Sequence, residues 1–345
     1  MNVGAAIAAS QRTTTGAPPM TRETDIGPVG AAHVPVMVGE VVEWLRPRPG
    51  ARLVDATVGL GGHAAALVAG APGSRLLGVD RDPRALARAR ERLLAAADRI
   101  ILRHGDFARL RAILLDVGWG DGADAVLLDL GVSSLQLDDP SRGFSFRAEG
   151  PLDMRMDPGE GRDAAEIVNT WPVQDLARAI ARYGEEPRAR AVASAIVRAR
   201  PLRTTEELAR AVAKVLGPGK PRRGSGPPGY RTNATRTFQA IRIAVNEELD
   251  RLERFLNDGW MVLRPGGRLA VLAYHSLEDR LVKEAFRRWG ASCLCPPGIV
   301  VCVCGWKAKV RVLTRRPLRP TSTETTRNPR ARSARLRLVE RLRDA

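Results

Sequence analysis

The stretch LVDATVGLGGHAAALV, residues 53–68, decides the fold of this chain. A short apolar run ends at Asp55, glycines follow at positions 59, 61 and 62, and an alanine-rich run of helical character begins near His63. A strand, a glycine-rich turn and a helix N-terminus in this order are typical of the nucleotide-binding end of a Rossmann-like fold, because the missing Cβ atoms let a ligand lie against the backbone and the helix amides. The stretch therefore predicts a ligand site at the first turn of an α/β sheet.

The rest of the chain repeats this alternation of strand and helix. Short apolar runs that end in an acidic or polar residue predict strands at residues 52–57, 75–80, 100–106 and 125–130, and a later one at 268–274. Among the intervening runs of helical length, residues 82–98 predict a helix with Asp82 as its N-cap. Strands that alternate with helices predict a parallel, doubly wound sheet.

The residues at the strand ends narrow the choice of ligand. The G-x-G-x-x-A motif that starts at Gly59 fits both a dinucleotide and S-adenosylmethionine, and Asp80, at the end of the second strand, is placed to bind ribose hydroxyls in either case. Phe107 follows the third strand, where an adenine ring can rest against it, and Asp129 ends the fourth. Methylation of an exocyclic amine needs acceptors for the amino protons, because the nitrogen lone pair is delocalised into the ring until those protons are held. Asp129 and nearby loop carbonyls can serve as these acceptors.

The alternation breaks after the fourth strand. A polar loop begins near residue 138, helices are expected near residues 173–182, 187–199 and 205–216, and one long helix is expected at 234–260. The helical block is expected to be inserted into the sheet domain. The expected organisation is a disordered tail at residues 1–30, the first part of the sheet domain at 31–137, an inserted helical substrate-recognition domain at 138–233, and the second part of the sheet domain with a basic C-terminal segment at 234–345.

The charge of the chain favours a polyanionic partner. The formal net charge is +17, and residues 307–345 hold thirteen Lys or Arg and three Asp or Glu, a net charge of +10. Each phosphate that such residues neutralise releases condensed counterions, so nucleic acid is favoured, although a genome that prefers arginine gives the same composition. We find neither a run of about 18 apolar residues nor a secretory signal, so we expect a cytoplasmic protein without a membrane partner.

Four cysteines lie together in CLCPPGIVVCVC, residues 293–304. Two Cys-x-Cys pairs on either side of a Pro-Pro-Gly turn can close a tetrahedral thiolate site, and a reducing cytosol argues against stable disulfides. Structural zinc sites usually have at least two residues inside each pair, whereas these pairs enclose one. Zinc, redox-sensitive thiols and ordinary reduced cysteines all stay open, and no metal ligand is assigned.

Longer motifs carry a resemblance to a known family. They are TVGLGGH, DLGVSSLQLDDPSRGFSFRAEGPLDMRMD, YGEE, ATRTFQAIRIAVNEEL, LRPGGRLAVLAYHSLEDR and NPRARSARLRLVER, in this order. The chain closely resembles the bacterial small-subunit rRNA cytosine-N4 methyltransferases, the RsmH or MraW family, over residues 33–341. The resemblance implies a Rossmann-like, S-adenosylmethionine-dependent methyltransferase with an inserted helical domain. It also implies the substrate, a cytosine of 16S rRNA in the decoding centre near the P site.

The resemblance further implies which residues bind the methyl donor. By motif match these are Gly61, Gly62, His63, Asp80, Phe107, Asp129 and Gln136. Two roles compete for Asp129, contact with the donor and acceptance of the target's amino protons, and one residue can perform both. Where the family usually has His-Pro before ATRTFQA, this chain has Thr232-Asn233, so no catalytic role is assigned there.

Other residues are candidates for binding the target nucleotide. His275 follows the late strand, where it can reach the base or accept a proton, with a structural or RNA-contact role as the alternative. Arg142, Phe144 and Phe146 can clamp or stack on a nucleotide flipped out of the RNA, and packing of their own loop is an equal alternative. Arg236 is a candidate phosphate contact, with a solvated surface charge as the alternative.

The sequence thus predicts direct methyl transfer to N4 of a cytosine. Methylation at C5 needs a cysteine nucleophile, and the cysteines lie far along the chain from the fourth strand. The expected partner is 16S rRNA in an assembled or late-assembling 30S subunit, and a homodimer is left open. The competing hypotheses are an NAD-linked oxidoreductase, an RNA-binding assembly factor with a vestigial donor pocket, and a small-molecule methyltransferase, which the basic C-terminal segment disfavours.

Overall fold

A computed structural model describes residue 1 and residues 34–217, 234–299 and 301–344. Two predicted features fall outside these residues. They are the expected disordered tail, apart from residue 1, and the Thr232-Asn233 pair.

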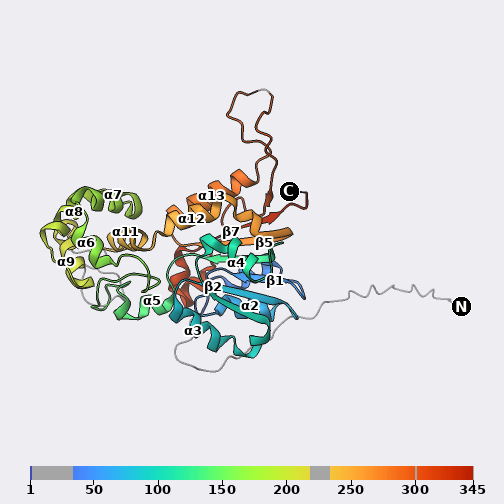
Figure 1. Ribbon diagram of the computed structural model, residues 1–345, viewed down its shortest axis with the longest axis horizontal. Helices are drawn as coiled ribbons and strands as arrows, with labels where there is room; N and C mark the ends of the chain where they lie inside the picture. Colours follow the sequence, from blue (N-terminus) through green and yellow to red (C-terminus); the bar gives the residue numbers. More distant parts are fainter. Residues whose placement is uncertain (2–33, 218–233, 300, 345) are drawn as a thin grey trace. The chain divides into compact units, whose positions relative to one another are not determined.

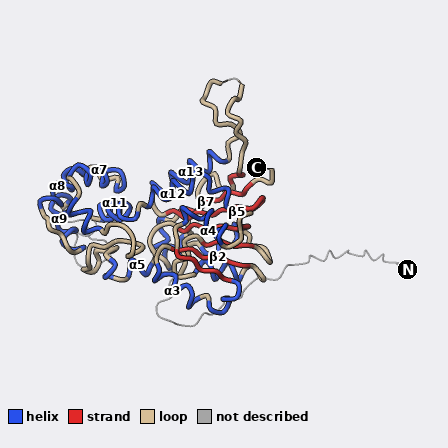
Figure 2. The backbone as a smooth tube through the Cα atoms, viewed as in Figure 1, coloured by secondary structure: helices blue, strands red, loops and turns tan. Residues whose placement is uncertain are grey.

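A seven-stranded sheet in the order β3-β2-β1-β4-β5-β7-β6 lies at the centre of the described fold (Figures 1 and 2). The strands are β1 Arg52–Asp55, β2 Arg75–Asp80, β3 Ile100–His104, β4 Ala123–Asp129, β5 Leu263–Ala273, β6 Val310–Val312 and β7 Arg335–Arg341. Strands β1 to β5 pair in parallel, whereas β7 is antiparallel to both β5 and β6. The predicted Rossmann-like α/β fold is confirmed, while the antiparallel β6–β7 pair was not predicted.

The strand register brings three acidic residues to one edge of the sheet. Asp55, the last residue of β1, pairs with Gly78 of β2 and with Leu127 of β4. Asp80 and Asp129 end their strands two residues beyond those partners. The chain winds from β1 through β2 to β3 on one side and then returns to β4 on the other, so β1 and β4 flank the point where the strand order reverses. Ligands of open α/β sheets bind at this point.

Helices cover both faces of the sheet. One face packs against α1 Val38–Leu45, α2 Gly62–Ala69 and α3 Pro83–Arg92. The other packs against α4 Leu110–Asp116, α12 Glu248–Asp258 and α13 Ser276–Trp289. Leu53 and Leu127 face the first set of helices and Val54 and Val126 the second, because successive strand side chains point to opposite faces.

The inserted helices form a unit with its own hydrophobic core. They are α6 Ala164–Thr170, α7 Val173–Gly184, α8 Ala189–Arg198, α9 Thr205–Leu216 and α11 Thr235–Asn246, which Figure 1 shows gathered together. Because Phe238 and Ile241 of α11 belong to this core, the helical unit continues past the expected boundary at residue 233. The prediction of a single helix at residues 234–260 is wrong. Glu247 adopts a left-handed φ of 51° and separates α11 from α12.

Short helices complete the described chain. They are α5 Ser134–Asp138, α14 Ser322–Arg327, and the 3-10 helices η1 Leu94–Arg99, η2 Phe107–Arg109, η3 Pro140–Arg142, η4 Gly259–Val262 and η5 Pro329–Ser333. Within the residues described, no helix has both the length and the apolar character that crossing a membrane requires.

Candidate functional site

The glycine turn after β1 joins the carboxyl ends of three strands. The backbone N–H of Gly59 donates to Asp80 Oδ2 at 2.7 Å, and the Thr57 hydroxyl accepts the backbone N–H of Asp129 at 2.7 Å. Gly59 and Gly61 have φ angles of 50° and 76°, left-handed conformations that glycine adopts without strain. The turn therefore fixes the positions of Asp80 and Asp129 relative to β1.

Gly62 lacks a Cβ for a reason that the sequence did not reveal. A Cβ there would lie 2.3 Å from Cγ of Pro35, so the chain's own N-terminal segment approaches the turn closely. His63 is 6% exposed, and its Nε2 lies 2.9 Å from the carbonyl oxygen of Val36. That oxygen can only accept, so Nε2 carries a proton. Pro35 and Val36 thus close one side of the turn.

The C-terminal part of the chain holds this closing segment in place. A carboxylate oxygen of Glu324, in α14, accepts the backbone N–H of Met37 at 2.6 Å. The Asn328 side-chain amide donates to the carbonyl of Val34 at 3.1 Å. The glycine turn is therefore completed by residues that lie almost 300 positions apart in sequence.

Asp129 is oriented by two side chains. Its Oδ1 accepts the hydroxyl of Tyr274 at 2.7 Å, and its Oδ2 lies 3.5 Å from Nδ1 of His63. Burial raises the pKa of Asp129, while His63 and the hydrogen bond from Tyr274 lower it. The side chain is 24% exposed, so a ligand can reach it. A carboxylate that is held in place and has a raised pKa accepts a proton more readily than an ordinary aspartate.

Two further carboxylates crowd the same edge of the sheet. Asp55 is 1% exposed, and its Oδ2 has no hydrogen-bond partner among the described residues. Burial raises the pKa of Asp55 to about 7, and the negative charge of Asp129 adds to the effect. Burial also raises the pKa of Asp80 to about 6, although the backbone N–H groups of Asp82 and Gly59 lower it. The edge is therefore rich in carboxylates whose charge burial disfavours.

This carboxylate cluster fits the cofactor that the resemblance implies. S-adenosylmethionine carries a sulfonium and an ammonium group, and a nearby positive charge favours the ionised form of buried carboxylates. Asp55 can contribute to this effect only through space, because its Oδ2 is buried and has no hydrogen-bond partner among the described residues. Asp80 accepts one backbone N–H on each oxygen and keeps lone pairs for ribose hydroxyls.

The raised pKa of Asp55 predicts how stability depends on pH. Its folded pKa of about 7 lies above the unfolded value of 3.8, so its contribution to stability is lost as the pH rises from about 4 to 7. The unfolding free energy of the wild type should fall between pH 5 and pH 8. In Asp55→Asn we expect this fall to be smaller by about 2–3 kcal/mol. Denaturant unfolding of the ligand-free protein at both pH values measures this.

The matched control for this prediction is Asp121→Asn. The hydrogen bond from Arg52 lowers the pKa of the exposed Asp121, so this carboxyl is ionised at both pH values in the folded and the unfolded chain. The control should leave the pH 5 to pH 8 difference unchanged. If the two variants show the same difference in unfolding free energy between pH 5 and pH 8, burial does not raise the pKa of Asp55.

Gln136 and Arg142 belong to a buried network around Asp82. Asp82 is fully buried, and its Oδ2 accepts Gln136 Nε2 at 2.9 Å and Arg142 Nη1 at 2.7 Å. Arg142 is 3% exposed, and its Nη2 donates to the carbonyls of Arg155 and Met156. For Arg142 these contacts favour packing of its own loop over a nucleotide clamp, because its guanidinium ties the loop after β4 to the start of α3. Gln136 as a donor contact stays a prediction.

The three candidate aromatic residues differ in their surroundings. Phe107 is half-buried in η2 and packs edge-on against Phe255 with ring centroids 6.0 Å apart, so its contact with adenine stays a prediction. Phe144 is 7% exposed and lies against the guanidinium of Arg142. Phe146 packs edge-on against Phe238 of the helical unit at 4.6 Å. For Phe144 and Phe146 these contacts favour loop packing over stacking on a nucleotide.

His275 and Arg236 lie in different environments. His275 is the N-cap of α13: its Nδ1 accepts the backbone N–H of Glu278 at 3.3 Å, and its Nε2 lies 3.2 Å from Glu278 Oε1 without hydrogen-bond geometry. This arrangement favours the structural alternative for His275. Arg236 is 58% exposed and donates to the Glu185 carbonyl at 3.4 Å, so it stays a candidate phosphate contact.

Three residues of the site were not assigned from the sequence. Asp55 did carry a signal, because it is the acid at the end of the first strand, directly before the glycines. Tyr274 follows β5, and only the pairing of β5 with β4 shows that it reaches Asp129. Pro35 carries no local signal, since its partner Gly62 lies in another element.

Comparisons with known proteins agree with this geometry. The family model described as the MraW methylase family matches residues 30–342. A protein named ribosomal RNA small subunit methyltransferase H from Thermomicrobium roseum is 51% identical over 91% of this chain and 95% of its own length. Proteins of the same name from Nitratidesulfovibrio vulgaris strain DP4 and Symbiobacterium thermophilum are each 48% identical, over 93% and 90% of this chain and 98% and 96% of their own lengths.

These matches decide between the enzyme classes that the glycine turn left open. They remove the NAD-linked oxidoreductase and confirm the expected family, with S-adenosylmethionine as the cofactor of its members. The family model spans nearly the whole described chain, and the Rossmann-like sheet agrees with it. This protein therefore belongs to the MraW methylase family.

Proposed function

We propose that this protein methylates N4 of a cytosine in the decoding centre of 16S rRNA, near the P site, and that it acts in the cytoplasm. The relatives named for methylation of the small-subunit ribosomal RNA match at least 90% of this chain at 48–51% identity. The net charge of +17 suits an RNA substrate. The motifs that resemble cytosine-N4 methyltransferases support the choice of atom and base.

The observation that carries the proposal is the position of Asp129 at the carboxyl end of β4, beside the glycine turn. S-adenosylmethionine, when bound, supplies an electrophilic methyl group. Asp129 accepts a hydrogen bond from the cytosine amino group, which directs the nitrogen lone pair towards that methyl group. As the N–C bond forms and the C–S bond breaks, Asp129 takes the proton that the nitrogen loses. The Tyr274 hydroxyl donates a hydrogen bond to Oδ1 of Asp129, whereas Oδ2 is the oxygen nearest His63. This hydrogen bond keeps the Asp129 carboxylate in place.

Direct transfer fits the location of the cysteines. All four follow α13, which begins at Ser276, beside the carboxyl edge of the sheet. The 14 residues of α13 carry the chain about 21 Å along the helix before the first cysteine. No thiol of the chain is therefore placed to attack the ring of a cytosine held at Asp129, as C5 methylation requires.

The proposal is tested with labelled S-adenosylmethionine and 30S subunits from a strain that lacks the modification. Nucleoside mass spectrometry of the recovered 16S rRNA should show N4-methylcytidine, and digestion to oligonucleotides should place it in the decoding centre. Methyl label on C5 or on another base would contradict the assignment of atom or base. Retained rRNA binding without any transfer would support the assembly-factor hypothesis instead.

The form of the substrate is part of the same proposal. We expect assembled or late-assembling 30S particles to be methylated faster than protein-free 16S rRNA, because the subunit presents the folded RNA around the target. Equal rates on both substrates would show that the RNA alone carries recognition. Sedimentation of the free protein tests separately whether it forms the homodimer that the sequence leaves open.

A further inference from the structure

The segment between α13 and β6 lacks regular secondary structure. Its described residues, 290–299 and 301–309, contain neither helix nor strand, and Figure 1 shows the segment projecting beyond α13. Four of its apolar side chains are exposed, and Val301 and Val303 are the most exposed of them, at 72% and 78%. Loops of about 20 residues without secondary structure are uncommon in compact domains. A segment that cannot bury apolar surface needs another stabilising interaction.

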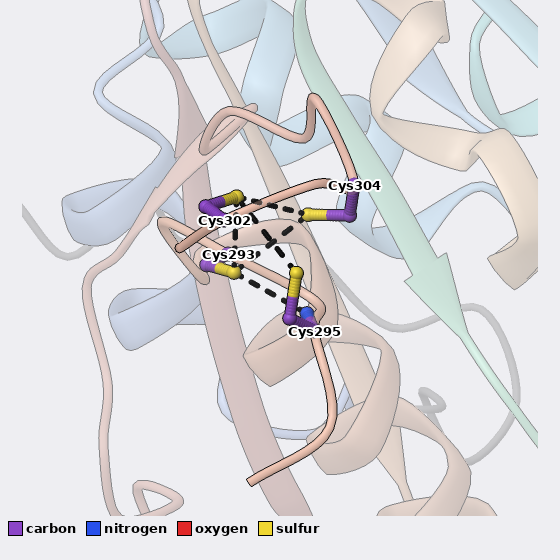
Figure 3. Close-up of side chains that lie close together, drawn as sticks. All are labelled: Cys293, Cys295, Cys302 and Cys304. Carbon is purple, nitrogen blue, oxygen red and sulfur yellow. Dashed lines mark hydrogen bonds between the residues drawn. The ribbon is translucent and has the colours of Figure 1, made fainter. Parts of the chain in front are cut away.

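The four cysteines of this segment point their sulfurs towards one another. Figure 3 shows one pair, Cys293 and Cys295, on the outgoing arm and the other pair, Cys302 and Cys304, on the returning arm. The Sγ atom of Cys302 lies 3.4 Å from that of Cys293, 3.9 Å from Cys295 and 3.5 Å from Cys304. Cys293 and Cys304 are 3.7 Å apart, and all four ligand atoms lie within 4.8 Å of one another.

These separations match a tetrahedron of thiolates around a single ion. With Zn–S bonds of about 2.3 Å, the edge of the tetrahedron is about 3.8 Å. Four of the six Sγ–Sγ distances, at 3.4–3.9 Å, lie around this value, and the other two are no longer than 4.8 Å. They are far longer than the S–S bond of about 2.05 Å in a disulfide. The short Cys-x-Cys spacing is no obstacle, because each arm contributes two ligands to one centre.

Backbone N–H groups of the segment also point at the sulfurs. The N–H of Leu294 lies 3.3 Å from Cys304 Sγ, that of Cys295 lies 3.3 Å from Cys293 Sγ, and that of Trp306 lies 3.5 Å from Cys304 Sγ. Such hydrogen bonds stabilise thiolate ligands and orient them, as outer-shell partners do in metal sites. They come from the segment's own backbone, so the arrangement is independent of the donor site.

We propose that Cys293, Cys295, Cys302 and Cys304 bind one Zn²⁺ ion, which fixes the fold of this segment. Four soft thiolates in a tetrahedral set suit zinc and exclude the hard cations Ca²⁺ and Mg²⁺, which take oxygen ligands. All four positions are filled by protein ligands, the pattern of a structural rather than a catalytic site. Trp306, two residues after Cys304, ties the segment to the residues that follow α13, because its Nε1 donates to the Ala291 carbonyl at 3.1 Å.

The first test is the metal content of the full-length protein, purified without chelators and measured by mass spectrometry of the elements. We expect about one zinc ion per chain. In the double variant Cys293→Ser/Cys302→Ser, zinc content after dialysis against a chelator should fall at least about fivefold relative to the wild type. Val303→Ser is the matched control, because it changes an exposed side chain between two ligands and should keep its zinc.

The second test reads the geometry of the site. Cobalt added to the metal-free, reduced protein should give the visible absorption of a tetrahedral tetrathiolate centre, and one equivalent of zinc should abolish it. Limited proteolysis should cut the segment faster in the double variant and leave the sheet domain intact. Stoichiometric iron in place of zinc, a reduced protein that takes up neither zinc nor cobalt, or cysteines recovered as disulfides under reducing purification would each overturn the proposal.

Discussion

Replacing Asp129 by asparagine is expected to lower kcat for methyl transfer to the 30S subunit by about 10²–10⁴-fold, the usual range for loss of a positioned base. The amide keeps the size of the side chain and an acceptor for Tyr274, but it cannot take the proton from the cytosine amine. If proton acceptance is the main role of Asp129, the affinity for S-adenosylmethionine, measured by calorimetry, should change by much less than kcat. A loss of affinity as large as the loss of rate would assign Asp129 to donor binding alone.

Tyr274→Phe is the control that separates chemistry from architecture. The hydrogen bond from Tyr274 lowers the pKa of Asp129, so its removal should raise that pKa and move the acidic limb of the pH–rate profile to higher pH. The loss of rate at high pH should be far smaller than in Asp129→Asn, because the carboxylate remains. A profile that does not move would show that Asp129 is not the group whose ionisation controls the rate.

Replacing Arg142 by methionine is expected to lower the free energy of unfolding by about 3–5 kcal/mol. The change removes the positive partner of Asp82, a fully buried carboxylate whose Oδ2 lies 2.7 Å from the guanidinium. Removal of one partner leaves an uncompensated buried charge, and the carbonyls of Arg155 and Met156 also lose their donor. Denaturant unfolding of the two proteins measures the difference.

Two comparisons make this prediction specific. Arg84→Met removes an arginine that is 58% exposed and lies 3.5 Å from Asp139, so it should change stability by no more than about 1 kcal/mol. The double variant Asp82→Asn/Arg142→Met should recover part of the lost stability, because asparagine is uncharged. The asparagine oxygen still accepts the N-cap hydrogen bond from the backbone N–H of residue Arg84. Normal stability combined with weak rRNA binding in Arg142→Met would restore the nucleotide-clamp hypothesis.

The sequence predicts the sheet domain well because its signals are local. The helix expected at residues 205–216 has those bounds, and β2 has the bounds expected from its apolar run. The break at Glu247 was missed, because the helical pattern continues through it and only the packing of α11 and α12 on different cores separates them. In β7 the many arginines conceal a strand whose Leu336 and Leu338 alternate into the core.

The candidate site was predicted in part, for a related reason. Asp80 and Asp129 end strands beside the glycine turn and meet there, as parallel strands require. For Arg142, by contrast, the sequence shows an arginine in a loop but not the buried carboxylate that claims it, because Asp82 lies 60 positions away. Whether a polar side chain serves the ligand or the fold depends on such distant partners.

The clasp of Glu324 and Asn328 on residues 34–37 has a consequence for biosynthesis. The segment that closes the glycine turn leaves the ribosome early, but its anchors are translated almost 300 residues later. A nascent chain can build β1 to β4 long before it can hold Pro35 over Gly62. The glycine turn therefore reaches its final form only near the end of translation, and a chain that stops before residue 324 should fold much of its sheet yet leave the turn open.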